Sequence, residues 1–209
     1  MATPLQLQPA VESDVPRIVE LERLAYADNP LTPIFFPGPF PPDVADTRAE
    51  ELVSELRKNP TVRWVKAVDS HINELVAFAK WTIVETVDAD TDADQAQPER
   101  SGNRNRTFGP GCNVEACEEF FGGIHRKRIL HTLQTDPKHQ RRGAGGLLIE
   151  WGLAIADDRH LPVYLESSPM AHSLYLKYGF YDIDQLRLDP KWNYGTADPT
   201  IYFMRRDAR

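Results

Sequence analysis

A short basic, glycine-rich segment holds the residues whose types and spacing point most directly to chemistry. It consists of Gln140, Arg141, Arg142, Gly143, Ala144, Gly145 and Gly146. Backbone N–H groups at the start of a helix lack partners within the helix and carry partial positive charge, so they bind phosphate-type anions. The glycines let a ligand approach the backbone closely, and the arginines add fork-shaped donors. The segment therefore predicts a binding site for a pyrophosphate.

The elements around this segment follow from the spacing of apolar residues and from end signals. A strand is predicted over 128–135, before the segment, and a helix over 144–158, after it. Another strand is expected over 161–166, and Ser168 with Pro169 marks the start of a further helix. This helix should end at a left-handed Gly179, with Phe180 making the hydrophobic contact that accompanies such ends.

The remaining elements are predicted from the same patterns. Strands are expected over 5–8, 63–68, 75–84, 180–188 and 200–205, and helices over 15–26, 42–58 and 114–121. Residues Asn29 to Pro42 are rich in proline and are predicted to form a loop. Residues 85–113 change in composition and are predicted to form a mobile surface insertion in a single domain spanning 1–209.

Composition limits the classes of function. The net charge of −7 and the pI near 5.4 argue against general nucleic-acid binding. No apolar run approaches the ~20 residues of a membrane span, and the N-terminus lacks a secretory signal pattern, so we expect a cytoplasmic protein. Cys112 and Cys117 are expected to be reduced thiols, and they are too few for a zinc site. The alternating aspartates from Asp88 to Asp94 lack the glycine and distal glutamate of a calcium loop, so no metal is expected.

Other phosphate-binding patterns fit the glycine segment poorly. A Walker A loop needs Gly-Lys-Ser or Gly-Lys-Thr, and neither occurs in the sequence. The dinucleotide-binding pattern of G-x-G-x-x-G requires a third glycine where Leu148 stands. A flexible glycine turn without a ligand is a further reading, but the two arginines and the apolar helix that follows argue against it.

Two motifs resemble those of the GNAT superfamily of acyl-CoA N-acyltransferases. The run Gln140 to Gly145 is similar to the Q/R-x-x-G-x-G/A pyrophosphate turn of that family. The run Ala171 to Phe180 is similar to its later helix, which ends in L-Y-x-K-x-G-F. The resemblance extends from about Leu5 to Arg205. It is most similar to a fungal-type branch in the run Gln140 to Gly145, then Leu148, Trp151, Ala156 and Asp157, and then Leu165 to Pro169. It implies an α/β (α+β) fold, a single domain with a central mixed, mostly antiparallel sheet flanked by helices.

The resemblance also implies a reaction and assigns residues to it. Acetyl-CoA would be the cosubstrate, without a metal, and its acetyl group would pass to a primary amine of a small molecule by direct attack. The alternatives are a protein or peptide N-acetyltransferase and a non-catalytic CoA-binding module, and O-acyl transfer stays open. Leu133, Gln134 and Thr135 would pair with pantetheine, and Gln140 to Gly146 would hold the pyrophosphate. Ser168 stands where the family often has a pantetheine-binding asparagine. Tyr175 occupies the position of the tyrosine that usually acts as the general acid toward the departing CoA thiolate.

The residues leave the base undecided. Glu166 ends a strand beside the expected pantetheine slot, where an apolar setting would raise its pKa toward neutrality. His131, on the preceding strand, has a suitable pKa without such help. A water chain is the third candidate, and each of Glu166, His131 and Tyr175 also has an ordinary structural reading.

The acceptor amine is the expected partner, with no nucleic acid and no membrane, and the chain is expected to be a monomer or homodimer. The pocket for the acceptor amine should involve Phe35, Phe36, the segment 115–121 and the last strands. Glu115, Glu118 and Glu119 would attract a cationic amine there, unless they form an ordinary solvated face.

Overall fold

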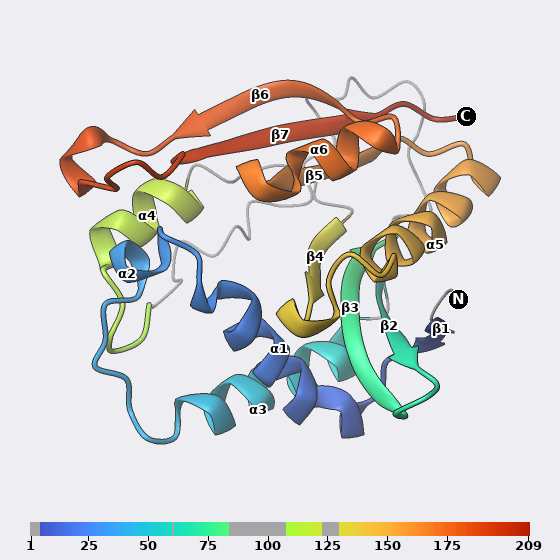
Figure 1. The fold of residues 1–209 in the computed structure, drawn as a ribbon, viewed down its shortest axis with the longest axis horizontal. Helices are drawn as coiled ribbons and strands as arrows, with labels where there is room; N and C mark the ends of the chain where they lie inside the picture. Colours follow the sequence, from blue (N-terminus) through green and yellow to red (C-terminus); the bar gives the residue numbers. More distant parts are fainter. Residues whose placement is uncertain (1–4, 60, 84–107, 123–129) are drawn as a thin grey trace.

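The computed structural model describes residues 5–59, 61–83, 108–122 and 130–209, which form one twisted sheet with helices on both faces (Figure 1). The strands are β1 (Leu5–Pro9), β2 (Val62–Asp69), β3 (Glu74–Thr82), β4 (Leu130–Thr135), β5 (Val163–Ser167), β6 (Tyr181–Arg187) and β7 (Thr200–Arg206). The α-helices are α1 (Val15–Ala27), α2 (Thr32–Phe35), α3 (Val44–Lys58), α4 (Val114–Gly122), α5 (Ala144–Asp158) and α6 (Pro169–Lys177). Three 3₁₀ turns, η1 (Glu12–Asp14), η2 (Pro137–His139) and η3 (Pro190–Trp192), complete the described elements.

The strands lie in the order β1-β2-β3-β4-β5-β7-β6. Neighbouring strands run antiparallel, except that β4 and β5 are parallel. The mixed, mostly antiparallel sheet flanked by helices confirms the predicted fold class. It also places the segment between β4 and α5 at the one parallel junction.

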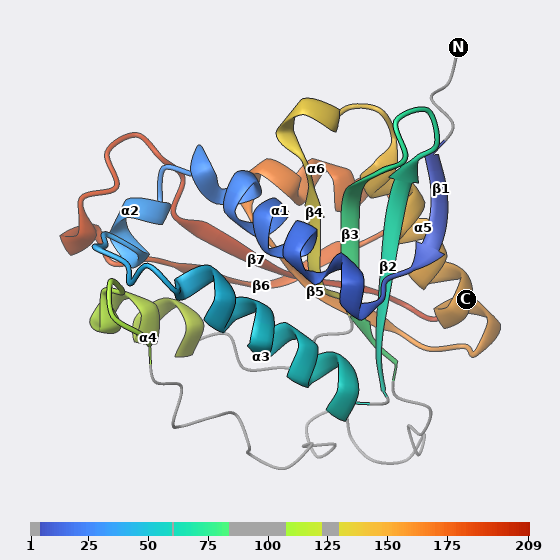
Figure 2. The same cartoon turned by 90° about the horizontal axis from the view of Figure 1, so that it is seen from below.

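Two hydrophobic clusters fill the two faces of the sheet. On β3, Phe78 packs with α1 and α3, whereas Trp81, on the opposite face, packs with α5. Figure 2 shows α1 and α3 side by side across β2 to β4, with α5 on the far side. Alternation along β3 therefore builds both cores, because successive side chains of a strand point to opposite faces.

A third cluster lies where α2 and α4 meet the ends of β6 and β7. Its centre is the contact of Phe35 with Phe120, whose ring centroids are 4.5 Å apart, and Leu188 and Ile201 close it from the strands. The prediction of a loop over 29–42 is wrong at α2, because Pro33 occupies an early helical position that tolerates its missing N–H and Phe35 gains a buried contact.

The other predicted elements in the described part of the chain are confirmed to within a few residues. The insertion expected over 85–113 lies outside the described residues up to 107, as do the first two residues of the strand expected over 128–135. Cys112 and Cys117 are free thiols, with Cys117 buried. No helix in the described ranges has the length and hydropathy needed to cross a bilayer.

Candidate active site

β4 and β5 share one register pair among the described residues, Leu130 with Leu165, and then separate toward their C-terminal ends. On its other edge β4 stays paired with β3, from Thr132 opposite Lys80 to Thr135 opposite Ala77. The edge of β4 from Leu133 to Thr135 therefore faces β5 without a strand partner in this register. Such an edge offers backbone N–H and C=O groups to an extended ligand.

The glycine segment connects the end of β4 to α5. Asp136 caps η2, because its carboxylate accepts a hydrogen bond from Lys138 N at 2.9 Å. Arg141 and Gly143 both have left-handed backbone, with φ of 61° and 92°, and Gly143 is the residue before the first turn of α5. A Cβ placed on Gly143 would have no described heavy atom within 4 Å, so the space over the start of the helix is open. This geometry fits a pyrophosphate held by backbone N–H groups.

The side chains of the two arginines take different directions. Arg141 is exposed, whereas Arg142 is half-buried and its guanidinium donates to Asp69 Oδ2 and contacts His139 Nδ1. The sequence predicted Arg142 as a phosphate ligand, whereas in the structure at least part of its guanidinium is hydrogen-bonded to protein atoms. Asp69 is 73 residues away along the chain, which is why sequence reasoning missed it.

Two further glycines lie where the segment meets β4 and α6. A Cβ on Gly145 would lie 3.5 Å from Leu133 and 3.6 Å from Leu174, which is ordinary contact. A Cβ on Gly146 would come within 2.4 Å of the Tyr178 hydroxyl. The glycine segment, β4 and α6 therefore meet at the open side of β4.

Tyr175 lies on α6 and is 5% exposed, with its ring edge-on to Phe180 at a centroid distance of 5.8 Å. Burial raises the pKa of the Tyr175 hydroxyl well above its usual value, and the nearby Tyr26 of α1 raises it further. Ser168 precedes α6 as its N-cap, yet its hydroxyl makes no capping hydrogen bond in this structure. The two residues thus lie on the side of the β4–β5 opening that α6 covers.

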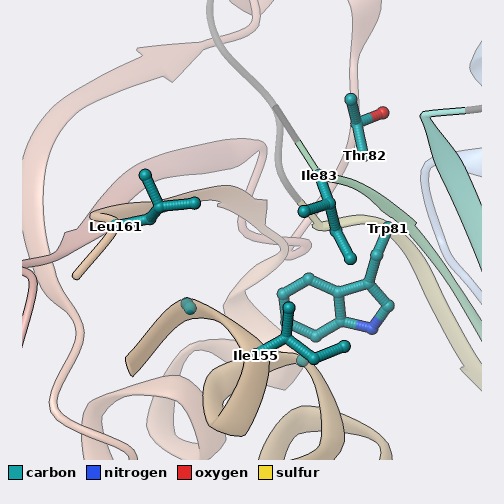
Figure 3. Close-up of a pocket in the computed structure, with 7 residues that line it drawn as sticks. Trp81, Thr82, Ile83, Ile155 and Leu161 are labelled. Atoms are coloured by element: carbon teal, nitrogen blue, oxygen red, sulfur yellow. The ribbon is translucent and has the colours of Figure 1, made fainter. Parts of the chain in front are cut away.

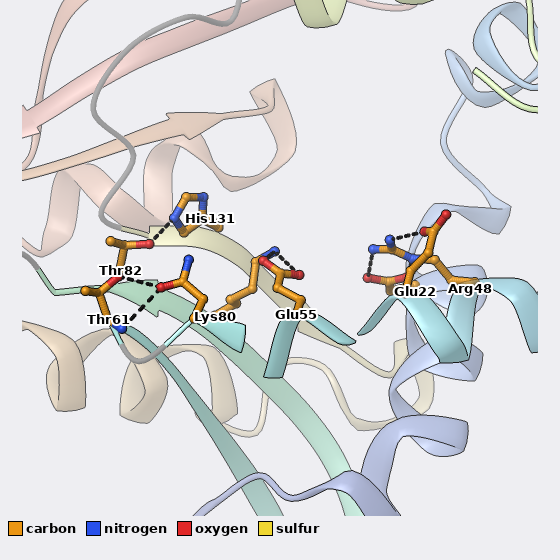
Figure 4. A network of polar contacts seen from close by, with 9 residues as sticks. Glu22, Arg48, Glu55, Thr61, Lys80, Thr82 and His131 are labelled. Atoms are coloured by element: carbon orange, nitrogen blue, oxygen red, sulfur yellow. Dashed lines mark hydrogen bonds and ion pairs between the residues drawn. The ribbon is translucent and has the colours of Figure 1, made fainter. Parts of the chain in front are cut away.

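His131 and Glu166 each follow one member of the Leu130–Leu165 pair, on adjacent strands. Leu130 and Leu165 are buried against α5 and α6, so the half-buried His131 and Glu166 belong to the opposite face, toward α1 and α3. His131 Nε2 is hydrogen-bonded to Thr82 Oγ1, and Figure 4 shows this pair beside Lys80 and its partner Glu55. The register therefore brings the two candidate bases to one place, at the start of the separation of the strands.

Gln134 also points to the α1 face of β4, because it lies opposite Phe78 in the register. Its side chain is 6% exposed, and its Oε1 has no hydrogen-bond partner among the described residues. A buried amide oxygen without a partner is uncommon in native proteins.

The residues predicted to line the acceptor pocket differ in burial and in their contacts. Phe35 is buried in the third cluster, and Phe36 is 37% exposed. Glu119 accepts hydrogen bonds from Asp189 N and Trp192 Nε1, and Lys191 pairs with both Glu115 and Glu119. Burial opposes ionisation of Glu119, but these hydrogen bonds together lower its pKa. Glu115 and Glu119 therefore hold α4 to η3, and of the three glutamates Glu115 and Glu118 are exposed whereas Glu119 is half-buried.

One small cavity lies on the other side of β3, between Trp81 and the end of α5 (Figure 3). Its volume of about 20 Å³ is enough for about one water molecule, and Ile155 and Leu161 help to line it. It is too small for a cofactor. The described residues also contain no group of three or more His, Cys, Asp or Glu side chains that could hold a metal ion.

Comparison with known proteins agrees with this geometry. Residues 114–189, which include β4, the glycine segment and α6, match the family model of the acetyltransferase (GNAT) domain. The stretch 114–189 is therefore assigned to the GNAT acetyltransferase family. A probable acyltransferase of the fungus Ajellomyces capsulatus, SID5, is 34% identical over 77 residues, which are 36% of this chain and 57% of that protein. The chain thus matches little more than half the length of this curated relative.

Solved GNAT structures share the fold over almost the whole chain. A histone acetyltransferase HPA2 and related acetyltransferase from Corynebacterium glutamicum has a TM-score of 0.61 and 22% identity, covering 98% of this chain and 97% of that one. A mosquito arylalkylamine N-acetyltransferase like 5b has a TM-score of 0.59 and 17% identity, with coverage of 97% and 99%. The PaiA N-acetyltransferase of Thermoplasma acidophilum, solved with coenzyme A, has a TM-score of 0.51 and 12% identity, with coverage of 97% and 98%. At these identities the likeness shows the fold.

Proposed function

We propose that the protein is an acyl-CoA-dependent N-acyltransferase that transfers an acetyl group from acetyl-CoA to a primary amine of a small molecule. The observation that carries the proposal is the separation of β4 from β5 beyond the Leu130–Leu165 pair, next to the glycine segment. One unpaired strand edge and one open helix start are what an extended pantetheine arm and its pyrophosphate require. Acetyl-CoA is the cosubstrate, and the reaction uses no metal.

The residues would hold the cosubstrate in two stretches. Leu133, Gln134 and Thr135 pair through the backbone with the pantetheine arm, and Ser168 contacts it from the start of α6. The first N–H groups of α5, around the left-handed Gly143, hold the pyrophosphate, with Arg141 as the exposed cation beside it. Held in this way, the thioester lies at the start of the strand separation.

The reaction is a direct attack. The neutral amine attacks the thioester carbonyl carbon, the carbon–sulfur bond breaks, and the sulfur leaves with its electron pair as a thiolate. The proton of the attacking nitrogen passes to Glu166, to His131, or through water to the solvent. Much of the acceleration comes from holding the two reactants in the geometry of attack.

Tyr175 acts on the leaving group. A thiol has a pKa near 8.5 and tyrosine one near 10, and burial raises the pKa of Tyr175 further. Its hydroxyl therefore stays protonated and stabilises the departing thiolate by donating a hydrogen bond, because complete proton transfer would be uphill.

The single domain over 1–209 would work in the cytoplasm as a monomer or homodimer, without nucleic acid or membrane. A small amine is the proposed acceptor class, and a peptide amine is the alternative. Neighbours in fold are titled for both kinds: a histone acetyltransferase and an arylalkylamine N-acetyltransferase.

Calorimetric titration with acetyl-CoA, and separately with CoA, tests the proposal first. We expect micromolar binding of both ligands, because the pyrophosphate and pantetheine contacts are common to them. Release of free thiol is then measured with polyamines, amino sugars, amino acids and a lysine-containing peptide as acceptors. Turnover with peptide alone would establish the alternative, binding without any turnover would indicate a CoA-binding module, and no binding at millimolar ligand would overturn the enzyme reading.

A further inference from the structure

We propose that Asp69, at the end of β2, is a positioning residue of the cofactor site, which it serves by holding Arg142 and so the glycine segment. The proposal rests on the proposed function, since it concerns the site that binds the CoA pyrophosphate. Asp69 would act through Arg142 and not through a contact of its own with the ligand. Arg142 then supports the site from within the protein, because its guanidinium is turned toward protein atoms.

Both oxygens of the Asp69 carboxylate are used. Oδ2 accepts from Arg142 Nη2 at 2.5 Å, and Oδ1 accepts from His71 N at 3.0 Å. The residue is 3% exposed, and a carboxylate that is out of contact with water needs an ionic partner. The hydrogen bond from Arg142 accordingly lowers the pKa of Asp69.

Arg142 lies between two residues with unusual backbone. Arg141 has φ of 61° and Gly143 has φ of 92°. A left-handed conformation is unfavourable for a residue other than glycine, so it persists only where surrounding contacts fix it. The guanidinium of Arg142 reaches Asp69 on one side and His139 on the other, which fixes the peptide groups that lead into the first turn of α5.

A second tie joins the other strand of the hairpin, β3, to Asp136 in the connection between β4 and α5. Arg17 of α1 donates to Asp136 Oδ2 at 2.6 Å and to the carbonyl oxygen of Leu75 at 3.1 Å. Asp136 N also donates to the carbonyl oxygen of Val76 at 2.9 Å. The β2–β3 hairpin thus contacts the segment between β4 and α5 from both of its strands, and Figure 2 shows the two lying at the same end of the sheet.

The positioning role of Asp69 predicts a change in CoA affinity opposite in direction to the change expected from its charge alone. If Asp69 were only a negative charge near the pyrophosphate, removing it would strengthen CoA binding, because like charges repel. If Asp69 positions the segment, removing it weakens binding, because the N–H groups lose their alignment. The direction of the change therefore separates positioning from simple electrostatics.

The test compares Asp69→Asn, Arg142→Gln and the double variant by calorimetric titration with CoA. We expect Asp69→Asn to weaken CoA binding about tenfold or more, the lower end of the loss seen when residues that orient metal ligands by hydrogen bonds are removed. The double variant should bind like Arg142→Gln alone, because the two residues act as one unit. Glu22→Gln is the matched control: it breaks an α1–α3 ion pair with Arg48 away from the segment and should leave the CoA affinity unchanged.

Ligand fragments separate a local effect from general loss of structure. Adenosine 3′-phosphate 5′-diphosphate retains the diphosphate and should lose affinity in parallel with CoA. Pantetheine lacks the diphosphate, and its binding, followed by saturation-transfer NMR, should stay at the wild-type level in Asp69→Asn. If Asp69→Asn does not fold, the double variant, which leaves no unpaired charge, is compared with Arg142→Gln, and equal CoA affinities are still expected.

The outcomes distinguish this proposal from the proposed function. Absence of CoA binding by the wild-type protein overturns the proposed function itself. Wild-type binding together with unchanged or tighter binding by Asp69→Asn overturns the positioning role alone. Additive effects in the double variant also overturn it, because Arg142 would then contact the ligand independently of Asp69.

Discussion

The hydroxyl of Tyr178 lies directly over Gly146 in the first turn of α5. A Cβ at position 146 would be 2.4 Å from the phenolic oxygen, closer than any ordinary contact. The same hydroxyl donates a hydrogen bond to Glu150 Oε1 at 3.3 Å. The glycine therefore lets the residue that caps α6 reach across the start of α5, beside the proposed pyrophosphate site.

We expect Gly146→Ala to lower the free energy of unfolding by about 1–2 kcal/mol, because overpacking pushes the hydroxyl aside. Adding Tyr178→Phe should recover most of this loss, since the phenyl carbon that remains would lie 3.6 Å from the new methyl group. Urea denaturation of both variants and of Tyr178→Phe alone measures the effect. A double variant no more stable than Gly146→Ala would show that the hydroxyl is not the cause.

Gly152, two turns further along α5, lies against the indole of Trp81. A Cβ there would approach three ring atoms at 2.3 to 2.5 Å, and Trp81 is 1% exposed, so relief of the clash requires a shift of a buried ring or of the helix backbone. Gly152→Ala should therefore cost about 3 kcal/mol or more, at the upper end of overpacking effects.

Gly109→Ala is the control for this prediction, because its Cβ would meet no described heavy atom within 4 Å. Thermal unfolding of the two variants gives the comparison, with a large fall in melting temperature expected for Gly152→Ala alone. Equal melting temperatures would mean that α5 shifts away from β3 without cost.

Elements with local signals could be predicted from the sequence. Helix α6 begins at Pro169 after Ser168, and it ends before Gly179, whose φ of 84° is the left-handed value that the motif predicts. Phe180 N donates to the carbonyl oxygen of Tyr175, and the two rings are in contact. Capping and turn residues act within a few positions along the chain, so such boundaries are readable without the fold.

Interactions between distant parts of the chain could not be predicted in the same way. Asp69 and Arg142 are 73 residues apart, and Arg17 and Asp136 are 119 apart, so each pair exists only after the strands have assembled. Asp136 before a proline shows a capping pattern, but nothing in the sequence indicates that it is buried. The sequence thus predicted the segment that would bind a pyrophosphate, but it did not predict that Asp69 and Arg17 would hold the connection between β4 and α5 in place.

The contribution of Asp136 to the stability of the protein should be lost at low pH. Burial alone would raise the pKa of this carboxyl, but the hydrogen bonds from Arg17 and from Lys138 N lower it overall. A carboxyl whose pKa is lower in the folded state stabilises the fold above its unfolded pKa of about 4, and this contribution is lost as the pH falls through the folded value.

Asp136→Asn should therefore cost roughly 2 kcal/mol at pH 7, the usual range for a hydrogen bond to a charged group. The difference from wild type should shrink as the pH falls below about 4, because the wild-type carboxyl becomes protonated. Denaturation curves from pH 7 to pH 2.5 measure it, with the exposed Asp28→Asn as control. A difference that does not change with pH would show that the charge of Asp136 contributes nothing.

Tyr175 should control stability at the alkaline end. Burial, with Tyr26 close by, raises the pKa of its hydroxyl in the folded state above the unfolded value of about 10. The folded state therefore holds the proton more tightly, so this stabilisation is complete below pH 10 and is lost as the pH rises toward the folded value. Tyr175→Phe should remove the part of the alkaline decline that Tyr175 causes.

The same variant tests the chemistry. We expect Tyr175→Phe to lower kcat by about 100-fold, which is the lower end of the loss seen when one hydrogen bond to a developing charge is removed. CoA affinity should stay within about twofold, because the hydroxyl acts on charge that appears only as the thiolate leaves. Tyr194→Phe, which removes the phenol oxygen of a half-buried tyrosine, is the control. An unchanged kcat combined with a flattened alkaline stability curve would make Tyr175 a core residue, and the thiolate would then depend on backbone donors alone.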